Sequence, residues 1–278
     1  MTRRAIRFLD QVNDEPFFLM VSHFFVHDPN HTRVRWLYER YYEALPESPR
    51  REKLAHYGAM VTTLDHHVGA LQTALSDTGK ADSTLVVFTS DNGGHPNYAG
   101  NAPLRGSKWN LYEGGIRVPF IVRWPGVAKS HSICDVPVWS PDLFPTFAEL
   151  TGADSSTAKD GRSLAPLLRN QDKQPAERNM VWHFPYYHPE TRYAERIDRI
   201  GIDDGETSKT KPHSAILAGN WKLLHFYEND ADELYDLSRD PSEAKNLASV
   251  RPDHAETLRN QLLTYLKDAN ARFPTVNK

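Results

Sequence analysis

The sequence predicts an α/β protein: a mostly parallel sheet between helices, followed by a small antiparallel sheet with one helix packed on it. Two observations support this prediction. Short apolar runs alternate with helical repeats over residues 1–175, as in strand–helix–strand units. Residues 176–278 instead hold four short strand-like runs and then one amphipathic segment. We therefore expect two domains, 1–175 and 176–278.

The elements of the first domain follow from the spacing of apolar residues. Continuous apolar runs have the length of strands buried on both faces. These runs are residues 16–22, 84–89 and 116–123. Apolar side chains recur at helical spacing over residues 57–75, which predicts a helix. A second helix is expected over residues 140–150, with Ser140 as its N-cap.

The second domain has the pattern of an antiparallel sheet. Its short strands are expected at residues 180–184, 214–218, 221–227 and 233–237. Gly219 and Asn220 separate two of them and suit a tight hairpin turn. Apolar residues between Ala255 and Ala269 fall on one face of a closing helix, which we expect to pack on this sheet.

Composition excludes several classes of protein. The chain of 278 residues is 39% hydrophobic and 25% charged, as in folded globular proteins. Its net charge of -3 gives no basic field for nucleic acid. No run of about 18 apolar residues occurs, so no transmembrane segment is expected. The single cysteine, Cys134, excludes an internal disulfide framework and is expected to be buried.

A polar cluster follows the predicted strand 84–89. It reads Ser-Asp-Asn-Gly-Gly over residues 90–94. Ligands gather where the strands of a parallel sheet end, and the oxygens of Asp91 and Asn92 suit Ca²⁺ or Mg²⁺. The glycines would let the backbone turn sharply beside a bound ion. The same four residues are also common in ordinary turns, so the tetrapeptide alone leaves both interpretations open.

Residues 104–119, LRGSKWNLYEGGIRVP, resemble a signature of the sulfatase family, within the alkaline-phosphatase-like superfamily. Further matches follow in the order that the family requires, at residues 16–19, 27–29, 85–93, 182–185, 221–223 and 233–243. The resemblance covers nearly the whole chain. It implies a sulfatase-like fold and the hydrolysis of a sulfate ester.

The resemblance also implies roles for individual residues. Asp91 and Asn92 match two ligands of a divalent cation, expected to be Ca²⁺ rather than Mg²⁺. Lys108 and His27 match residues that hold the sulfate oxygens. This agrees with the chemistry, because a sulfate ester gathers negative charge on its oxygens as it is cleaved. The same arrangement suits a phosphate ester, so a phosphodiesterase or phosphatase of the superfamily remains an alternative.

Other residues have less specific expectations. Arg105 could contact substrate or the metal-binding loop, and the two alternatives are open. His183 and His188 are candidates for the substrate pocket. Glu113 and Arg117 are expected to make structural contacts around the neighbouring glycines. Bacterial relatives with this C-terminal pattern often act on sulfated carbohydrates, so such a substrate is expected.

The expected nucleophile is not found in the sequence. In sulfatases it is a formylglycine made from Cys or Ser within C/S-x-P-x-R, and no such pentapeptide occurs here. The family's N-terminal Asp pair, which completes the metal site, is absent too. The chain therefore resembles the C-terminal portion of a sulfatase, with little activity expected alone. The alternative is a non-catalytic remnant, or a subunit completed by a separate N-terminal chain. Periplasmic or secreted location is expected if the full-length protein has a signal peptide.

Overall fold

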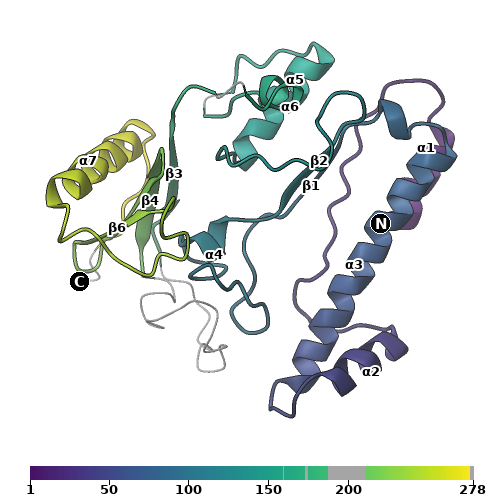
Figure 1. Ribbon diagram of the computed structural model, residues 1–278, viewed down its shortest axis with the longest axis horizontal. Coiled ribbons are helices and arrows are strands. Elements are labelled where there is room, and N and C mark those ends of the chain that lie inside the picture. The colour runs from purple at the N-terminus through teal and green to yellow at the C-terminus, as the bar shows by residue number, and fades with distance from the viewer. Residues whose placement is uncertain (159, 173–174, 187–210, 276–278) are drawn as a thin grey trace. The chain divides into compact units, whose positions relative to one another are not determined.

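The computed structural model forms two compact units (Figure 1). The first comprises Met1–Val87 and Val122–Ile133, and the second comprises Phe88–Ile121 and Cys134–Lys278. The structure describes residues 1–158, 160–172, 175–186 and 211–275. The expected boundary at residue 175 lies inside the second unit, and the division into domains 1–175 and 176–278 stays a prediction.

The first unit is built around one long helix. Its helices are α1 (Thr2–Gln11), α2 (Arg35–Ala44), α3 (Arg51–Asp77) and the short 3-10 helix η1 (Ala81–Ser83). Leu9 of α1 packs against Ala74 and Leu75 of α3. The helix expected over residues 57–75 is confirmed and begins earlier. Of the described helices, none is long and apolar enough to cross a membrane.

Residues 16–22 do not form the expected strand. Phe17 and Leu19 pack against the cluster around Leu9, whereas Phe18 and Met20 are 67% and 77% exposed. Burial thus alternates along the run, as it does in a strand. A strand also needs a hydrogen-bonded neighbour, and the described residues pair no other strand with this run.

The strands β1 (Val86–Thr89) and β2 (Phe120–Arg123) pair in a two-stranded sheet. The expected strand 84–89 is confirmed, and it begins two residues later, at Val86. The expected strand 116–123 is shorter than predicted, because a helical turn, α4 (Glu113–Ile116), takes its first residue. Pro119 has no N–H to donate, so β2 begins after it.

The helix expected over residues 140–150 starts as a 3-10 turn, η2 (Ser140–Asp142), and continues as α5 (Leu143–Thr151). Ser140 is not the N-cap. The carboxylate of Asp142 accepts the Trp139 N–H at 3.2 Å and pairs with Arg178. The short helix α6 (Ala165–Arg169) follows. Cys134, upstream of this turn, is exposed rather than buried.

The C-terminal sheet is confirmed as antiparallel. Its strands pair in sequence order: β3 (Asn179–Phe184), β4 (His213–Ala218), β5 (Trp221–Phe226) and β6 (Ala231–Asp236). The turn between β4 and β5 contains Gly219 with φ +59°, a conformation that favours glycine. Helix α7 (Pro252–Asp268) covers one face of this sheet (Figure 1).

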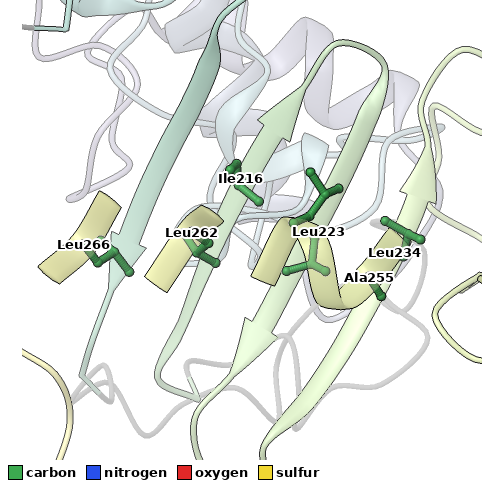
Figure 2. Packing of buried hydrophobic residues seen from close by; sticks show 7 residues of the cluster. Ile216, Leu223, Leu234, Ala255, Leu262 and Leu266 are labelled. Carbon is green, nitrogen blue, oxygen red and sulfur yellow. The ribbon is translucent and has the colours of Figure 1, made fainter. Parts of the chain in front are cut away.

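The two faces of the C-terminal sheet have different partners. On one face Ile216, Leu223 and Leu234 stand directly opposite one another in register. They pack with four residues of α7, namely Ala255, Leu258, Leu262 and Leu266 (Figure 2). The other face packs against residues 111–112. We call residues 104–119 the signature loop, and this contact places it against the sheet.

Candidate active site

The signature loop and the turn at residues 91–94 are joined by backbone hydrogen bonds. The Gly93 N–H donates to the Gly115 carbonyl at 2.8 Å. The Lys108 N–H donates to the Gly94 carbonyl at 2.9 Å. From residue 105 to residue 115 every residue is buried except Lys108 and Trp109, which are partly exposed. The loop therefore presents Lys108 beside the turn that carries Asp91 and Asn92.

The glycines of the turn are required for a different reason from the one predicted. We expected them to allow a sharp backbone turn, but neither has positive φ. A Cβ added to Gly93 would lie 1.8 Å from the Gly114 carbonyl oxygen, and one added to Gly94 would lie 2.3 Å from the Ala99 Cβ. Glycine is needed here because the backbone of Gly114 approaches Gly93 and the side chain of Ala99 approaches Gly94 too closely for any side chain.

Asn92 has an unsatisfied oxygen. Its Oδ1 is buried and accepts no hydrogen bond from any of the described residues. A buried polar atom without a protein partner costs roughly 1–3 kcal/mol, so Asn92 Oδ1 is expected to meet water or an ion. The adjacent Asp91 is exposed, and its Oδ1 accepts the Asn92 N–H at 3.0 Å. A carboxylate and an amide oxygen side by side suit a hard divalent cation.

The cation ligands in the described part of the chain are incomplete. There, no group of three or more His, Cys, Asp or Glu side chains is arranged to hold a metal. Ca²⁺ takes about six to eight oxygen ligands, more than Asp91 and Asn92 offer. His27 lies in the first compact unit, whereas Asp91, Asn92 and Lys108 lie in the second. Its membership of the same site therefore stays a prediction.

Arg105 makes contacts within the protein interior. Its Nη1 donates to the Tyr235 hydroxyl at 2.8 Å and to the Glu243 carbonyl at 3.2 Å. Its guanidinium lies over the Tyr112 ring, 4.2 Å from the centroid. Only 8% of the residue is exposed. These contacts are with neither of the two expected partners, substrate and the metal-binding loop; they tie Arg105 to the C-terminal sheet and to Glu243.

Glu113 belongs to a buried group of charges, whose other members lie far from it in the sequence. Lys222 Nζ lies 2.9 Å from Glu113 Oε1 and 2.9 Å from Glu243 Oε1. Glu243 Oε2 also accepts the Glu113 N–H at 2.6 Å. We call Glu113, Lys222 and Glu243 the buried charge cluster. Arg117, 3.8 Å from Glu113 and largely exposed, lies at its edge.

The protonation of the buried charge cluster follows from its surroundings. Burial alone would lower the pKa of Lys222, but the carboxylates of Glu243 and Glu113 outweigh it and raise that pKa. Burial raises the pKa of Glu243, and Lys222 opposes the rise. Sequence reasoning missed Lys222 and Glu243. The available signal was one lysine within the apolar strand 221–226, where a cation needs a buried partner.

His213, on β4, connects the C-terminal sheet to the signature loop. Its Nε2 lies 3.0 Å from the Leu111 N–H, so this nitrogen is the acceptor. Its Nδ1 then carries the proton and donates to the Lys211 carbonyl at 2.6 Å. Both nitrogens are satisfied only in the neutral ring. Burial lowers the pKa of His213 from 6.5 to about 4.

The depressed pKa of His213 predicts a loss of stability in acid. The unfolded chain binds a proton near pH 6.5 and the folded chain only near pH 4. The contribution of neutral His213 to the free energy of unfolding is therefore complete above pH 6.5, and it is lost as the pH falls toward the pKa of the folded state. Between about pH 7.5 and about pH 4.5 this residue should remove about 2–3 kcal/mol of unfolding free energy.

Urea unfolding of the wild type and of His213→Gln at both pH values measures this contribution. Glutamine keeps an acceptor for the Leu111 N–H and does not titrate. Between the two pH values, we expect the unfolding free energy of His213→Gln to fall less than that of the wild type. The difference between the two falls should be about 2–3 kcal/mol. An equal fall in the two proteins would contradict the assignment.

The two candidate pocket histidines have different outcomes. His183 lies on β3, where its Nδ1 is 2.5 Å from Ser214 Oγ and its Nε2 is 2.8 Å from the Arg272 carbonyl. Both ring nitrogens thus have protein partners, which favours a structural role over contact with substrate. His188 lies outside the described residues.

Solved structures share this fold. A 2-O GAG sulfatase aligns with a TM-score of 0.58 at 24% identity, over 96% of this chain and 57% of that one. The structure of Ps i-CgsB in complex with k-i-k-neocarrahexaose aligns with a TM-score of 0.75 at 25% identity, over 95% of this chain and 53% of that one. The protein thus has the α/β fold of the sulfatases, as the sequence predicted.

Sequence comparison defines the family. The Sulfatase family model matches residues 1–153, and the model of the C-terminal region of N-sulphoglucosamine sulphohydrolase matches residues 107–272. A sulfatase of Formosa agariphila is 33% identical over 93% of this chain and 47% of its own length. Human arylsulfatase A is 32% identical over 95% of this chain and 51% of its own length. The chain belongs to the sulfatase family, and it spans about half the length of these relatives.

Proposed function

We propose that the protein contributes half of a site that hydrolyses sulfate esters, with a divalent cation, Ca²⁺ in preference to Mg²⁺, at Asp91 and Asn92. The observation that most supports this is the buried, unpartnered Oδ1 of Asn92, next to the Asp91 carboxylate. Bound Ca²⁺ would satisfy that oxygen. It would also neutralise charge that develops on the ester oxygens.

In this proposal Lys108 holds the sulfate group. The Lys108 N–H donates a hydrogen bond to the carbonyl of Gly94, which lies two residues after Asn92 in the sequence. This bond holds the backbone of Lys108 next to the turn. Its ammonium group would donate hydrogen bonds to the sulfate oxygens and stabilise the negative charge that grows during cleavage. The assignment of His27 to the same oxygens rests on the family resemblance alone.

The nucleophile is not among these 278 residues, because they contain no C/S-x-P-x-R motif. A formylglycine, when present, supplies the group that attacks sulfur. We propose that a nucleophile-bearing polypeptide, corresponding to the N-terminal half of the relatives, completes the site together with the remaining cation ligands. The chain alone should then hydrolyse no sulfate ester.

We further propose a sulfated carbohydrate as the substrate. One structural neighbour is in complex with k-i-k-neocarrahexaose. Another is in complex with its substrate, D-glucosamine-2-N,6-O-disulfate, and aligns with a TM-score of 0.59 at 25% identity. These ligands belong to the neighbours, and they support the substrate class here because the fold is shared.

Complementation tests the proposed function. We would combine the chain with the nucleophile-bearing N-terminal portion of the Formosa agariphila sulfatase and measure hydrolysis of 4-nitrophenyl sulfate. Activity is expected only in the combined protein, and EGTA should abolish it until Ca²⁺ is restored.

Two results would count against the proposal. Equal activity after exhaustive chelation would contradict the cation assignment to Asp91 and Asn92. A stable, folded complex without hydrolysis would favour the alternative of a non-catalytic remnant. An inactive form of the added portion, with its nucleophilic Cys or Ser replaced by Ala, is the control for background cleavage.

A further inference from the structure

We propose that Glu113, Lys222 and Glu243 are positioning residues, which set the place of the cation ligand Asn92 and of Lys108 through a short path of contacts. The inference rests on the proposed function for its metal site. It assigns to the C-terminal sheet a role in the geometry of that site.

The path begins at the sheet and ends at the turn. Lys222 on β5 holds the side chain of Glu113, the first residue of α4. Two residues further on, the Gly115 carbonyl accepts the Gly93 N–H at 2.8 Å. Gly93 is the direct neighbour of Asn92. The buried Lys222 is therefore connected to the turn at residues 91–94 through the Glu113 side chain, the backbone of residues 113–115 and one backbone hydrogen bond.

Glu243 holds the signature loop at two points. Its side-chain Oε2 accepts the Glu113 N–H at 2.6 Å, and its carbonyl accepts a hydrogen bond from Arg105 at 3.2 Å. Arg105 and Glu113 flank the stretch that contains Lys108. The backbone of the loop closes between them, since the Gly114 N–H donates to the Arg105 carbonyl at 2.6 Å. Both ends of the Lys108 segment are thus held by one residue.

The segments along this path are closely packed. A Cβ on Gly114 would lie 2.4 Å from the Gly106 carbonyl oxygen, and one on Gly115 would lie 2.1 Å from the Asn110 carbonyl oxygen. Backbones packed this closely move together, because close-packed interiors transmit displacement. A shift of Glu113 is therefore passed to the turn at Gly93.

A buried cluster of charges is better suited to fixing the positions of neighbouring residues than to stabilising the folded state. Apolar residues of similar volume often stabilise a core as well as a buried ion pair does. Paired charges that are also hydrogen-bonded, however, fix one geometry, since each atom must meet its partner. Lys222 and Glu243 are fully buried and their charges are paired within this cluster, which matches that use.

The test has two readouts, and both use the chain completed with the N-terminal portion of the Formosa agariphila sulfatase. Amide hydrogen exchange of Gly93 and Lys108 reports the backbone contacts, and Tb³⁺ luminescence with Ca²⁺ competition reports the cation site. In Glu113→Gln, which keeps an oxygen for Lys222 but removes the charge, both amides should exchange at least about tenfold faster. The affinity for Tb³⁺ should fall by about tenfold or more.

Arg178→Met is the matched control. It breaks another buried pair, that of Arg178 with Asp142. Within the described residues, the hydrogen bonds of this pair join it to Trp139, Thr146 and Arg162, which lie outside the signature loop. We expect this variant to lower the free energy of global unfolding and to leave the Tb³⁺ affinity unchanged. The exchange rates of Gly93 and Lys108, after correction for the change in global unfolding, should also stay the same. Glu243→Gln is the second variant, in case Glu113→Gln fails to fold.

The outcomes separate the two proposals. Unchanged exchange and affinity in both glutamine variants, or equal changes in Arg178→Met, would overturn the positioning role. If the protein completed with the N-terminal portion binds neither Tb³⁺ nor Ca²⁺, that result would count against the proposed cation site. The exchange rates of Gly93 and Lys108 would still decide whether the cluster positions the turn.

Discussion

Lys108→Ala in the protein completed with its nucleophile is expected to lower the turnover of an aryl sulfate by about 10²-fold or more. Removing one group that stabilises transition-state charge usually has an effect of this size. The loss should fall mainly on turnover, because the charge that Lys108 meets is largest during cleavage. Steady-state kinetics with 4-nitrophenyl sulfate measure it.

Lys245→Ala is the control for this prediction, since it removes a lysine whose residue is exposed in the same compact unit. It should change turnover by less than about twofold, as expected for a surface site. A loss of less than about threefold in Lys108→Ala would place Lys108 outside the site, given the usual size of such effects.

Lys222→Met should lower the free energy of unfolding by about 3–5 kcal/mol. The substitution keeps an unbranched apolar stem but leaves the carboxylates of Glu113 and Glu243 buried with no cation between them. Removing one partner of a buried ion pair leaves an uncompensated charge, which accounts for most of the loss. Urea unfolding at neutral pH measures the change.

A triple variant separates the charge effect from packing. Lys222→Met combined with Glu113→Gln and Glu243→Gln removes all three charges and keeps the volumes close to the original. We expect it to recover at least about half of the lost stability, because no unpaired charge remains. If Lys222→Met alone loses less than about 1 kcal/mol, the cluster is more hydrated than its burial indicates.

The local patterns in the sequence were enough to predict most of the fold. Helical spacing identified α3 and α7, and short apolar runs separated by turns identified the four strands of the C-terminal sheet. Residues 16–22 were predicted wrongly, because an apolar run shows burial but not whether a hydrogen-bonded neighbour exists. Helix α2 was missed since it buries only Leu37, which gives no periodic signal.

The candidate site was predictable only where one motif contains it. Asp91, Asn92 and Lys108 lie within one stretch of sequence, and the hydrogen bonds of Gly93 and Lys108 confirm that the stretch folds together. The contacts of Arg105, Glu113 and His213 could not be predicted. Each joins residues about 100 or more positions apart, and no local pattern records which partner a buried charge will meet.

The contact between the signature loop and the C-terminal sheet bears on how such proteins can be recombined. Leu111 and Tyr112 are buried against β4, β5 and β6, so a cut near residue 175 would separate the signature loop from its support. An exchange of C-terminal sheets between relatives would also exchange the partners of Arg105 and Glu113. The smallest portion that could be grafted as a working piece is therefore the loop together with the sheet, taken from one parent.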